Sequence, residues 1–307
     1  MDIYLPIAEL AMPWIVPILI GTLVGALSGL FGVGGGFIMN PLLIMLGVPP
    51  AVAVSTGALQ IVAASVSGAF AHWRRGTVDW AMAGCMIGGG LTGALAGNRL
   101  FVLLRSIGQI DLVIALSYVI LLGVMGGLML AESARAILRT RAGTAVRSKL
   151  HQHTWLHGLP LKVKFRKSRL YVSVFLPFGI GIVVGLMTAI MGVGGGFLAV
   201  PAMIYLMGMP TMLTVGTSLL QITATSAAVV YLQAISTHAV DVVLASLLIL
   251  GGVAGAQAGA AVGQRLRGEY ARFLLGLIVV AVAVWVLYGL IATPSQLFTI
   301  EYRPAEY

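Results

Sequence analysis

One glycine-rich stretch occurs twice in the chain, and each copy interrupts a long apolar segment. The first copy is Phe31-Gly-Val-Gly-Gly-Gly-Phe-Ile-Met-Asn-Pro41, and the second, 160 residues later, is Met191-Gly-Val-Gly-Gly-Gly-Phe-Leu-Ala-Val-Pro201. Three consecutive glycines make a poor helix interior, because each costs about 0.8–1.0 kcal/mol relative to alanine. In lipid, such a break also frees backbone N–H and C=O groups, which protein, water or a ligand must satisfy. Two matched breaks in corresponding halves are typical of a transporter binding site.

The composition indicates an all-α polytopic membrane protein. Apolar residues make up 59% of the chain, charged residues 9%, and the mean hydropathy is +1.03. Soluble domains carry about 25% charged residues, so we expect no separately folded soluble domain. The N-terminus lacks the basic region of a signal peptide, and we expect the first apolar segment to be retained. Cys85 is the single cysteine, which excludes an intramolecular disulfide and a cysteine-based metal cluster.

The net charge of +9 comes from one central segment, because ten Lys and Arg and no acid lie between Ser133 and Arg169. We predict a first membrane repeat over residues 1–131, a basic linker over residues 132–169 and a second membrane repeat over residues 170–307. The positive-inside rule places the linker in the cytoplasm, where anionic lipid headgroups can bind it. Nucleic-acid binding is not expected, since the linker contains no recognition module.

Each repeat contains a short apolar segment directly after its glycines, over residues 37–47 and 197–207. Eleven residues of helix reach only about 16 Å, roughly half of a ~30 Å hydrocarbon core. We predict that each repeat is a re-entrant helical hairpin with a glycine-rich tip, followed by three transmembrane helices. Tilted half-spans are the alternative for the two short segments.

The repeat continues beyond the glycines, and the charges of its loops predict that the two halves are inverted. Ser55-Thr-Gly-Ala-Leu-Gln60 matches Gly216-Thr-Ser-Leu-Leu-Gln221, and Val78-Asp79 matches Val240-Asp241. The turn with Arg74 and Arg75 falls on the linker side, whereas its counterpart before Asp241 falls on the other side and has no Lys or Arg. Equivalent turns thus have opposite charge bias, as inverted-topology repeats require, and both termini are expected in the periplasm.

The glycine breaks are also the predicted substrate site. A helix start presents free N–H groups and the positive end of its dipole, and it can bind an anion without a buried charge. Two such starts, after the two glycine runs, would meet near the membrane midplane. Close backbone packing between helices is the alternative interpretation. The residues predicted for this part of the site are Gly34, Gly35, Gly36, Phe37, Asn40, Gly194, Gly195, Gly196 and Phe197.

A second polar cluster is predicted to form another wall of the site, because matched glutamines in lipid are hard to explain by packing alone. Hydroxyls that bond to the carbonyl four residues earlier are the structural alternative. This cluster consists of Ser55, Thr56 and Gln60, with Thr217, Ser218 and Gln221.

Two carboxyl groups stand directly before predicted helices. Asp79 and Asp241 fit helix N-caps, and the sharper hypothesis is that they couple transport to protons. No catalytic triad, HExxH motif or paired intramembrane carboxylates suggest an enzyme, and we predict no catalytic residue, cofactor or metal.

The doubled motif resembles the TauE/SafE sulfite exporter family. The resemblance rests on the Gly32–Gly36 run with Pro41, on Gly-Val-Pro, Ser-Thr-Gly and the His72–Asp79 segment, and on their second copies. It implies a multi-pass transporter of the bacterial inner membrane that exports a small sulfur-containing anion, such as sulfite, sulfoacetate or a related organosulfonate. A passive anion channel, or the same fold carrying a non-sulfur organic anion, is the alternative. The expected partners are this anion and the lipid bilayer, and a homodimer is left open.

Overall fold

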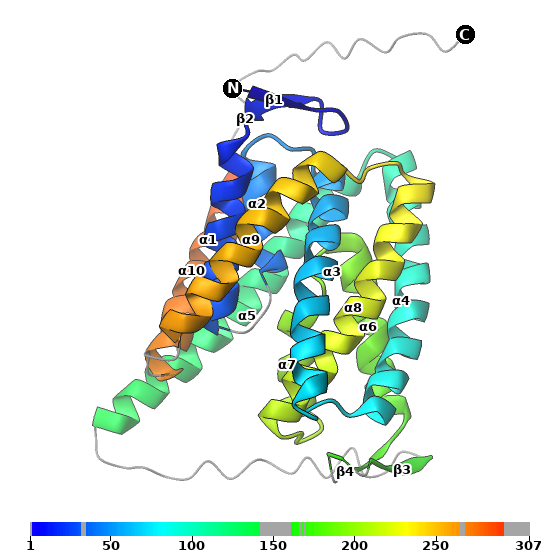
Figure 1. The fold of residues 1–307 in the computed structure, drawn as a ribbon, viewed down its shortest axis with the longest axis vertical. Helices are drawn as coiled ribbons and strands as arrows, with labels where there is room; N and C mark the ends of the chain where they lie inside the picture. Colours follow the sequence, from blue (N-terminus) through cyan, green and yellow to red (C-terminus); the bar gives the residue numbers. More distant parts are fainter. Residues whose placement is uncertain are drawn as a thin grey trace.

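The computed structural model describes residues 2–31, 35–141, 161–165, 167–168, 170–263 and 268–291, and the predicted site residue Gly34 lies outside them. Within these ranges the chain forms ten helices and two small β-hairpins (Figure 1). The first half comprises β1 (Asp2–Leu5), β2 (Leu10–Pro13), α1 (Ile15–Phe31), α2 (Gly36–Met45), α3 (Pro50–Arg74), α4 (Trp80–Ser106) and α5 (Ile110–Arg141). The second half comprises β3 (Lys162–Phe165), β4 (Leu170–Ser173), α6 (Phe175–Met191), α7 (Gly196–Tyr205), α8 (Thr211–Ser236), α9 (Val242–Gly263) and α10 (Gly268–Ile291).

The two halves have the same order of elements. Helices α1 and α6 each have 17 residues, and α2 and α7 each have ten. Six helices, α3, α4, α5, α8, α9 and α10, contain stretches long and apolar enough to cross a membrane. The two predicted short helices are present as α2 and α7, and each begins at the last glycine of its run, one residue before the predicted start. Both keep an internal proline, Pro41 or Pro201, at their sixth position.

Two features of the fold differ from the sequence prediction: the length of α5 and the presence of two β-hairpins. Helix α5 continues to Arg141, ten residues past the predicted end of the first repeat at residue 131, because these residues are mostly helix formers without glycine or proline. A β-hairpin also precedes the first helix of each half, pairing β1 with β2 and β3 with β4 in antiparallel fashion. The alternating Lys162-Val-Lys-Phe165 pattern is a strand signal that could have predicted the second hairpin.

Contacts between the halves dominate the packing. The most extensive helix pairs are α1 with α9, α4 with α6, α5 with α10 and α3 with α8, and each joins one half to the other. Glycines allow two of these pairs to touch backbone to backbone. A Cβ built on Gly255 would lie 2.0 Å from the Thr22 carbonyl oxygen, and one on Gly93 would lie 2.1 Å from that of Ile182. Small residues thus bring membrane helices together by van der Waals contact.

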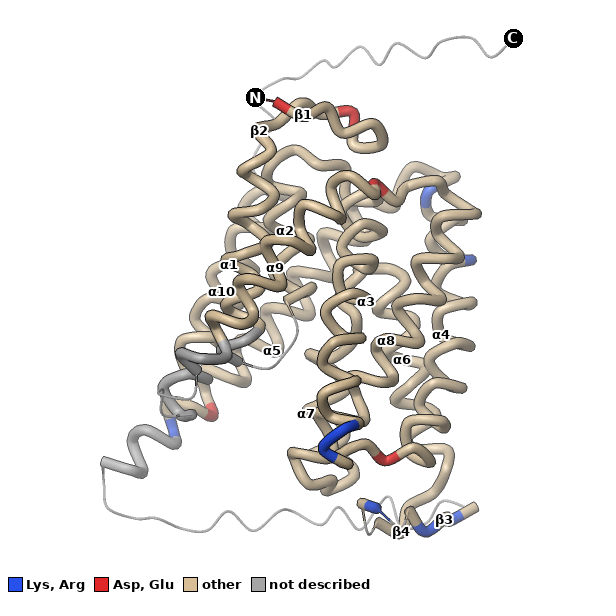
Figure 2. The backbone as a smooth tube through the Cα atoms, viewed as in Figure 1, with Lys and Arg blue, Asp and Glu red and all other residues tan. Residues whose placement is uncertain are grey.

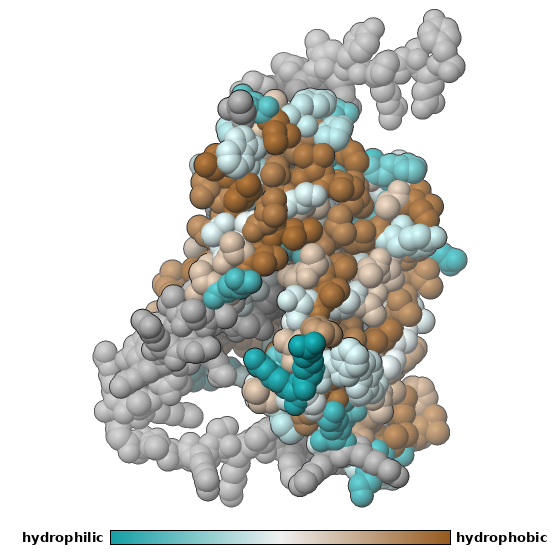
Figure 3. Space-filling model, in the orientation of Figure 1, coloured by the Kyte–Doolittle hydropathy of each residue, from teal (hydrophilic) through white to brown (hydrophobic). Residues whose placement is uncertain are grey.

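The two hairpins lie at opposite ends of the bundle, and the charges follow them (Figures 1 and 2). Lys and Arg gather at the β3–β4 end, where α3 also ends with Arg74. Between the ends, apolar side chains predominate on the face shown in Figure 3. Large apolar residues of the bundle are widely exposed, for example Leu250, which is 64% exposed. Arg105 lies at the opposite end of α4, where its Nη1 donates to the Thr237 carbonyl oxygen at 2.7 Å. That bond gives this arginine a structural role at the less basic end.

We predict that the two hairpins face opposite sides of the membrane. Tyr4 in β1 and Lys164 in β3 are both exposed, so single cysteines there should be accessible to a membrane-impermeant thiol reagent. In a background with Cys85 replaced by alanine, Lys164→Cys should react only from the cytoplasmic side and Tyr4→Cys only from the periplasmic side. Labelling of both positions from one side would contradict the opposed arrangement.

Candidate functional site

The starts of the two short helices meet in the middle of the bundle. Phe37 follows the first residue of α2 and Phe197 follows the first residue of α7, and their rings stack with centroids 4.5 Å apart and planes 19° apart. Both side chains are buried. The first backbone bonds of the two helices are made by the N–H groups of Ile38 and Leu198, which donate to the carbonyl oxygens two positions before Phe37 and Phe197. The N–H groups at the very start of each helix therefore have no acceptor in their own helix.

The two glycine breaks differ in backbone conformation. Gly194 and Gly195 have φ of 74° and 72°, in the left-handed region that favours glycine. Gly35 has φ of −81° and ψ of −10°, which any residue can adopt. At Gly35 the constraint is packing instead, because an added Cβ would lie 2.6 Å from Cγ1 of Val24. Of the equivalent glycines Gly35 and Gly195, only Gly195 therefore requires glycine for its backbone.

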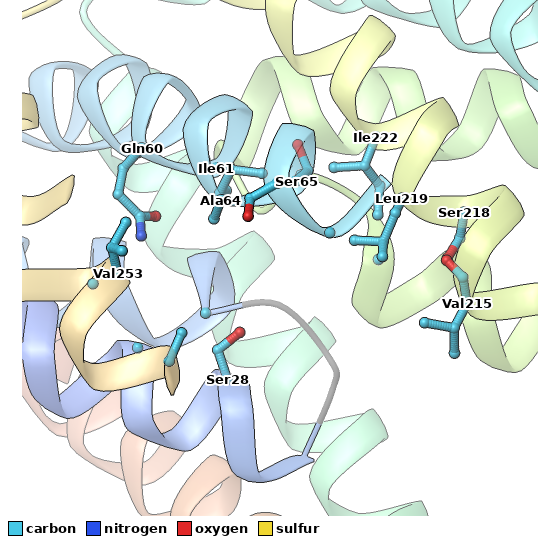
Figure 4. Close-up of a pocket in the computed structure, with 18 of the residues that line it drawn as sticks. Ser28, Gln60, Ile61, Ala64, Ser65, Val215, Ser218, Leu219, Ile222 and Val253 are labelled. Atoms are coloured by element: carbon cyan, nitrogen blue, oxygen red, sulfur yellow. The ribbon is translucent and has the colours of Figure 1, made fainter. Parts of the chain in front are cut away.

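A cavity of about 470 Å³ lies beside the two breaks and is bounded by α1, α3, α7, α8 and α9 (Figure 4). Along α3 the lining extends from Gln60 to Arg75, about 22 Å of helix. Five predicted substrate-binding residues line it: Gly35, Gln60, Gly194, Gly196 and Ser218. The other described candidates lie outside the lining: Gly36, Phe37, Asn40, Ser55, Thr56, Gly195, Phe197, Thr217 and Gln221.

The far end of the cavity carries a positive charge that is not among the predicted site residues. His72 and Arg75 line the cavity there, and His72 Nδ1 lies 2.8 Å from the Thr77 hydroxyl. The neighbouring Arg74 does not line the cavity, because its guanidinium lies over the Phe70 ring, 4.6 Å from the ring centre. Of these two adjacent arginines, only Arg75 is placed to attract an anion into the cavity.

Asn40 connects the first short helix to the second glycine break. Its Nδ2 donates to the Met191 carbonyl oxygen at 2.8 Å and to the Tyr118 hydroxyl at 3.0 Å, and Tyr118 also donates to Met191. All of these groups are buried. Met191 is the last residue of α6, so Asn40 and Tyr118 satisfy a carbonyl that the break leaves free. Tyr118 carries no sequence signal for this role, because the stretch of α5 around it, residues 112–131, is apolar apart from Ser117.

Asp79 and Asp241 occupy equivalent places at opposite ends of the bundle. Asp79 Oδ1 accepts from the Met82 N–H and Asp241 Oδ1 from the Leu244 N–H, so both are N-caps, as predicted. The backbone N–H of each aspartate donates to a threonine hydroxyl of the other half, Asp79 to Thr217 at 3.1 Å and Asp241 to Thr56 at 3.0 Å. The predicted Thr56 and Thr217 therefore bind these turns in the structure.

The second oxygen of each carboxylate holds a β-hairpin. Asp79 Oδ2 accepts from the backbone N–H and the hydroxyl of Ser168, between β3 and β4. Asp241 Oδ2 accepts from the N–H groups of Ile7 and Ala8, between β1 and β2, at 3.2 and 3.4 Å. Each aspartate thus fastens together a helix of its own half and the hairpin of the other. A role for either carboxylate in proton coupling stays a prediction.

The arrangement is that of a multi-pass membrane transporter, with six candidate spans, of which α3, α8 and α9 line a cavity beside two paired short helices. The family model for the sulfite exporter TauE/SafE matches residues 17–286, and the chain belongs to this family. A probable membrane transporter protein of Xylella fastidiosa (strain 9a5c) is 32% identical over 272 residues, which cover 87% of this chain and 92% of the relative. The probable membrane transporter protein YjnA of Bacillus subtilis (strain 168) is 30% identical over 265 residues, 85% of this chain and 95% of the relative. No solved structure gives a significant match.

We predict that Asp79→Ala destabilises the protein more than Asp111→Ala does. Asp79 is buried, and its loss leaves the N–H groups of Met82 and Ser168 without an acceptor, at a cost of at least about 2 kcal/mol. Asp111 is also in a first helical turn but is exposed, so its loss should cost less than about 1 kcal/mol. Thermal unfolding in detergent measures the difference, and equal shifts for the two variants would contradict the assignment.

Proposed function

We propose that this protein is a secondary transporter that exports a small sulfur-containing anion, such as sulfite, sulfoacetate or a related organosulfonate, across the bacterial inner membrane. The cavity beside the two short helices is the proposed substrate site, and the two halves are the inverted repeats around it. The observation that most directly supports this proposal is that the two helix starts meet at the Phe37–Phe197 stack. The cavity beside them is lined by Gly35, Gly194 and Gly196. Two positive helix ends at one place favour an anion.

The electrostatics of the cavity support an anionic substrate. Among the described residues, its lining contains the cationic Arg75 and no Asp or Glu, and its other polar groups include the neutral side chains of Gln60 and Ser218. An anion entering past Arg75 would meet amides, hydroxyls and helix starts without an opposing carboxylate. The matching hairpins at opposite ends of the bundle, each held by an aspartate of the other half, support inverted repeats.

A passive anion channel with the same cavity is the second candidate, and counterflow separates the two. Purified protein in vesicles preloaded with unlabelled sulfite should accelerate uptake of labelled sulfite if it is a carrier. An open pore would let the label equilibrate without transient accumulation. A panel of sulfite, sulfate, sulfonates and carboxylates, scored by thermal stabilisation, tests the substrate class. Stabilisation by carboxylates alone would refute the sulfur assignment in favour of another organic anion.

The two adjacent arginines provide a matched test of anion attraction. Arg75→Gln should raise the KM for the transported anion by up to about fivefold, because it removes a solvent-accessible charge from the cavity. Arg74→Gln should leave KM near the wild-type value, since Arg74 stacks on Phe70 outside the cavity. The difference should shrink at high ionic strength, where charges are screened. Equal KM values for the two variants at low salt would contradict a role for Arg75.

The left-handed glycines provide a second matched test. Gly194 and Gly208 have φ of 74° and 70°, so alanine at either position costs roughly 1–2 kcal/mol of backbone strain. Only Gly194 lines the cavity, whereas nothing lies within 4 Å of a Cβ at Gly208. We expect Gly194→Ala to lose more thermal stability than Gly208→Ala, because its Cβ would also lie 2.6 Å from Cγ2 of Ile61. Anion-induced stabilisation should be lost in Gly194→Ala and kept in Gly208→Ala. Retained stabilisation in both variants would make Gly194 a packing position.

A further inference from the structure

The two glutamines of the repeated motif are not equivalent in the folded protein. In α8, Gln221 Nε2 donates to the hydroxyl of Thr225, four residues later on the same face, at 3.0 Å. In α3, the residue four positions after Gln60 is Ala64, which has no hydroxyl. The same-face partner that holds Gln221 is therefore missing for Gln60.

The opposite helices do not account for this difference, because each glutamine faces a glycine at a matching position. A Cβ built on Gly252 of α9 would lie 2.9 Å from Gln60 Nε2. A Cβ built on Gly90 of α4 would lie 3.3 Å from Gln221 Nε2. The two amides thus have similar surroundings on the side of α9 and α4. What distinguishes them is the residue four positions later, which is Ala64 after Gln60 and Thr225 after Gln221.

Gln60 combines an unpartnered amide with a place in the cavity wall. Its side chain is 6% exposed, and its buried Oε1 has no hydrogen-bond partner among the described residues. Figure 4 shows the side chain extending from α3 into the space beside Ser28 and Val253. Gln221 Oε1 also has no hydrogen-bond partner among the described residues, but Gln221 does not line the cavity. Because buried polar groups are rarely left unpaired, we expect the Gln60 amide to bind a ligand in the cavity.

We propose that Gln60 determines substrate specificity, and that it selects small anions that carry a hydrogen-bond donor in addition to their negative charge. Hydrogensulfite and hydroxyalkanesulfonates belong to this class. This inference rests on the proposed function, since it assigns the chemistry of the same site. Gln221, held by Thr225, is not a ligand group.

The chemistry of the amide explains the selection. An amide oxygen accepts only, so Gln60 Oε1 needs an O–H or N–H group and disfavours a fully deprotonated oxygen. The amide NH₂ of the same side chain can donate to an anionic oxygen, so one residue can bind both ends of a protonated or hydroxylated anion. A ligand without a donor would leave the buried oxygen unpaired, and polar sites reject such analogues strongly.

An isosteric pair of ligands tests this selection in the purified full-length protein. 2-Hydroxyethanesulfonate carries a hydroxyl where 1-propanesulfonate carries a methyl group, and 3-hydroxypropanoate and butanoate form the same pair among carboxylates. Isothermal titration calorimetry should show that the hydroxylated member binds at least about fivefold more tightly, the size expected for one satisfied buried acceptor. Gln60→Leu should reduce this preference to less than about twofold, because it removes that acceptor.

An isosteric pair of variants then tests the reason for the asymmetry. Ala64→Thr adds the hydroxyl that Gln221 has in Thr225, and Ala64→Val adds the same bulk without it. We expect Ala64→Thr to weaken the preference for the hydroxylated anion, because its hydroxyl can accept from Gln60 Nε2, as Thr225 accepts from Gln221 Nε2, and hold the amide against its own helix. Ala64→Val should keep the preference, even if both variants bind more weakly. Thr225→Ala should keep the preference, since Gln221 lies outside the cavity lining.

The outcomes separate this inference from the proposed function. If both sulfonates bind equally and the threonine and valine variants behave alike, the role of Gln60 is wrong while sulfonate binding stands. If only the carboxylates bind and the preference depends on Gln60, the sulfur assignment is wrong and the role of Gln60 stands. Binding of none of the four anions would overturn both.

Discussion

The contact between Phe37 and Phe197 is the point on which the rest of the structure depends. It joins two interrupted backbones, each with N–H groups that its own helix cannot satisfy. A membrane tolerates such breaks only inside protein or beside a water-filled cavity. Here each break faces the other, the cavity lies beside both, and Asn40 and Tyr118 satisfy the carbonyl of Met191. The helices that surround this centre keep lipid away from it.

Contacts that cross between the halves hold this centre together. Backbone contact at Gly93 and Gly255 brings α6 and α1 against helices of the opposite half. The turns at the two ends are tied in the same crossed manner, because Asp79 and Asp241 each bind a threonine and a hairpin of the other half. Neither half could form these contacts alone, so each completes the other.

Small departures from equivalence give the site its chemistry. Asn40 in α2 corresponds to Val200 in α7, and only Asn40 can bind the opposite break. Ala64 corresponds to Thr225, and this single hydroxyl holds the NH₂ group of Gln221, whereas Gln60 has no such partner on its own helix. A duplicated chain provides two similar walls, whereas the proposed substrate, a small anion with distinct ends, would require different groups on each. These substitutions supply that difference.

The membrane class, the repeat, the two short helices and the N-caps at Asp79 and Asp241 could be predicted from the sequence, because apolar length, glycine breaks and capping residues act locally. The second hairpin and the extension of α5 also have local signals, in the alternating Lys162–Phe165 pattern and in the helix formers up to Arg141. Which candidates reach the cavity was decided by the tertiary structure alone. Gln60 and Gln221 carry the same sequence signal, yet only Gln60 lines the cavity. Arg74 and Arg75 are adjacent, yet one stacks on Phe70 and the other faces the cavity. The reason is that a motif specifies a position on one helix, whereas a binding site depends on which faces of several helices meet.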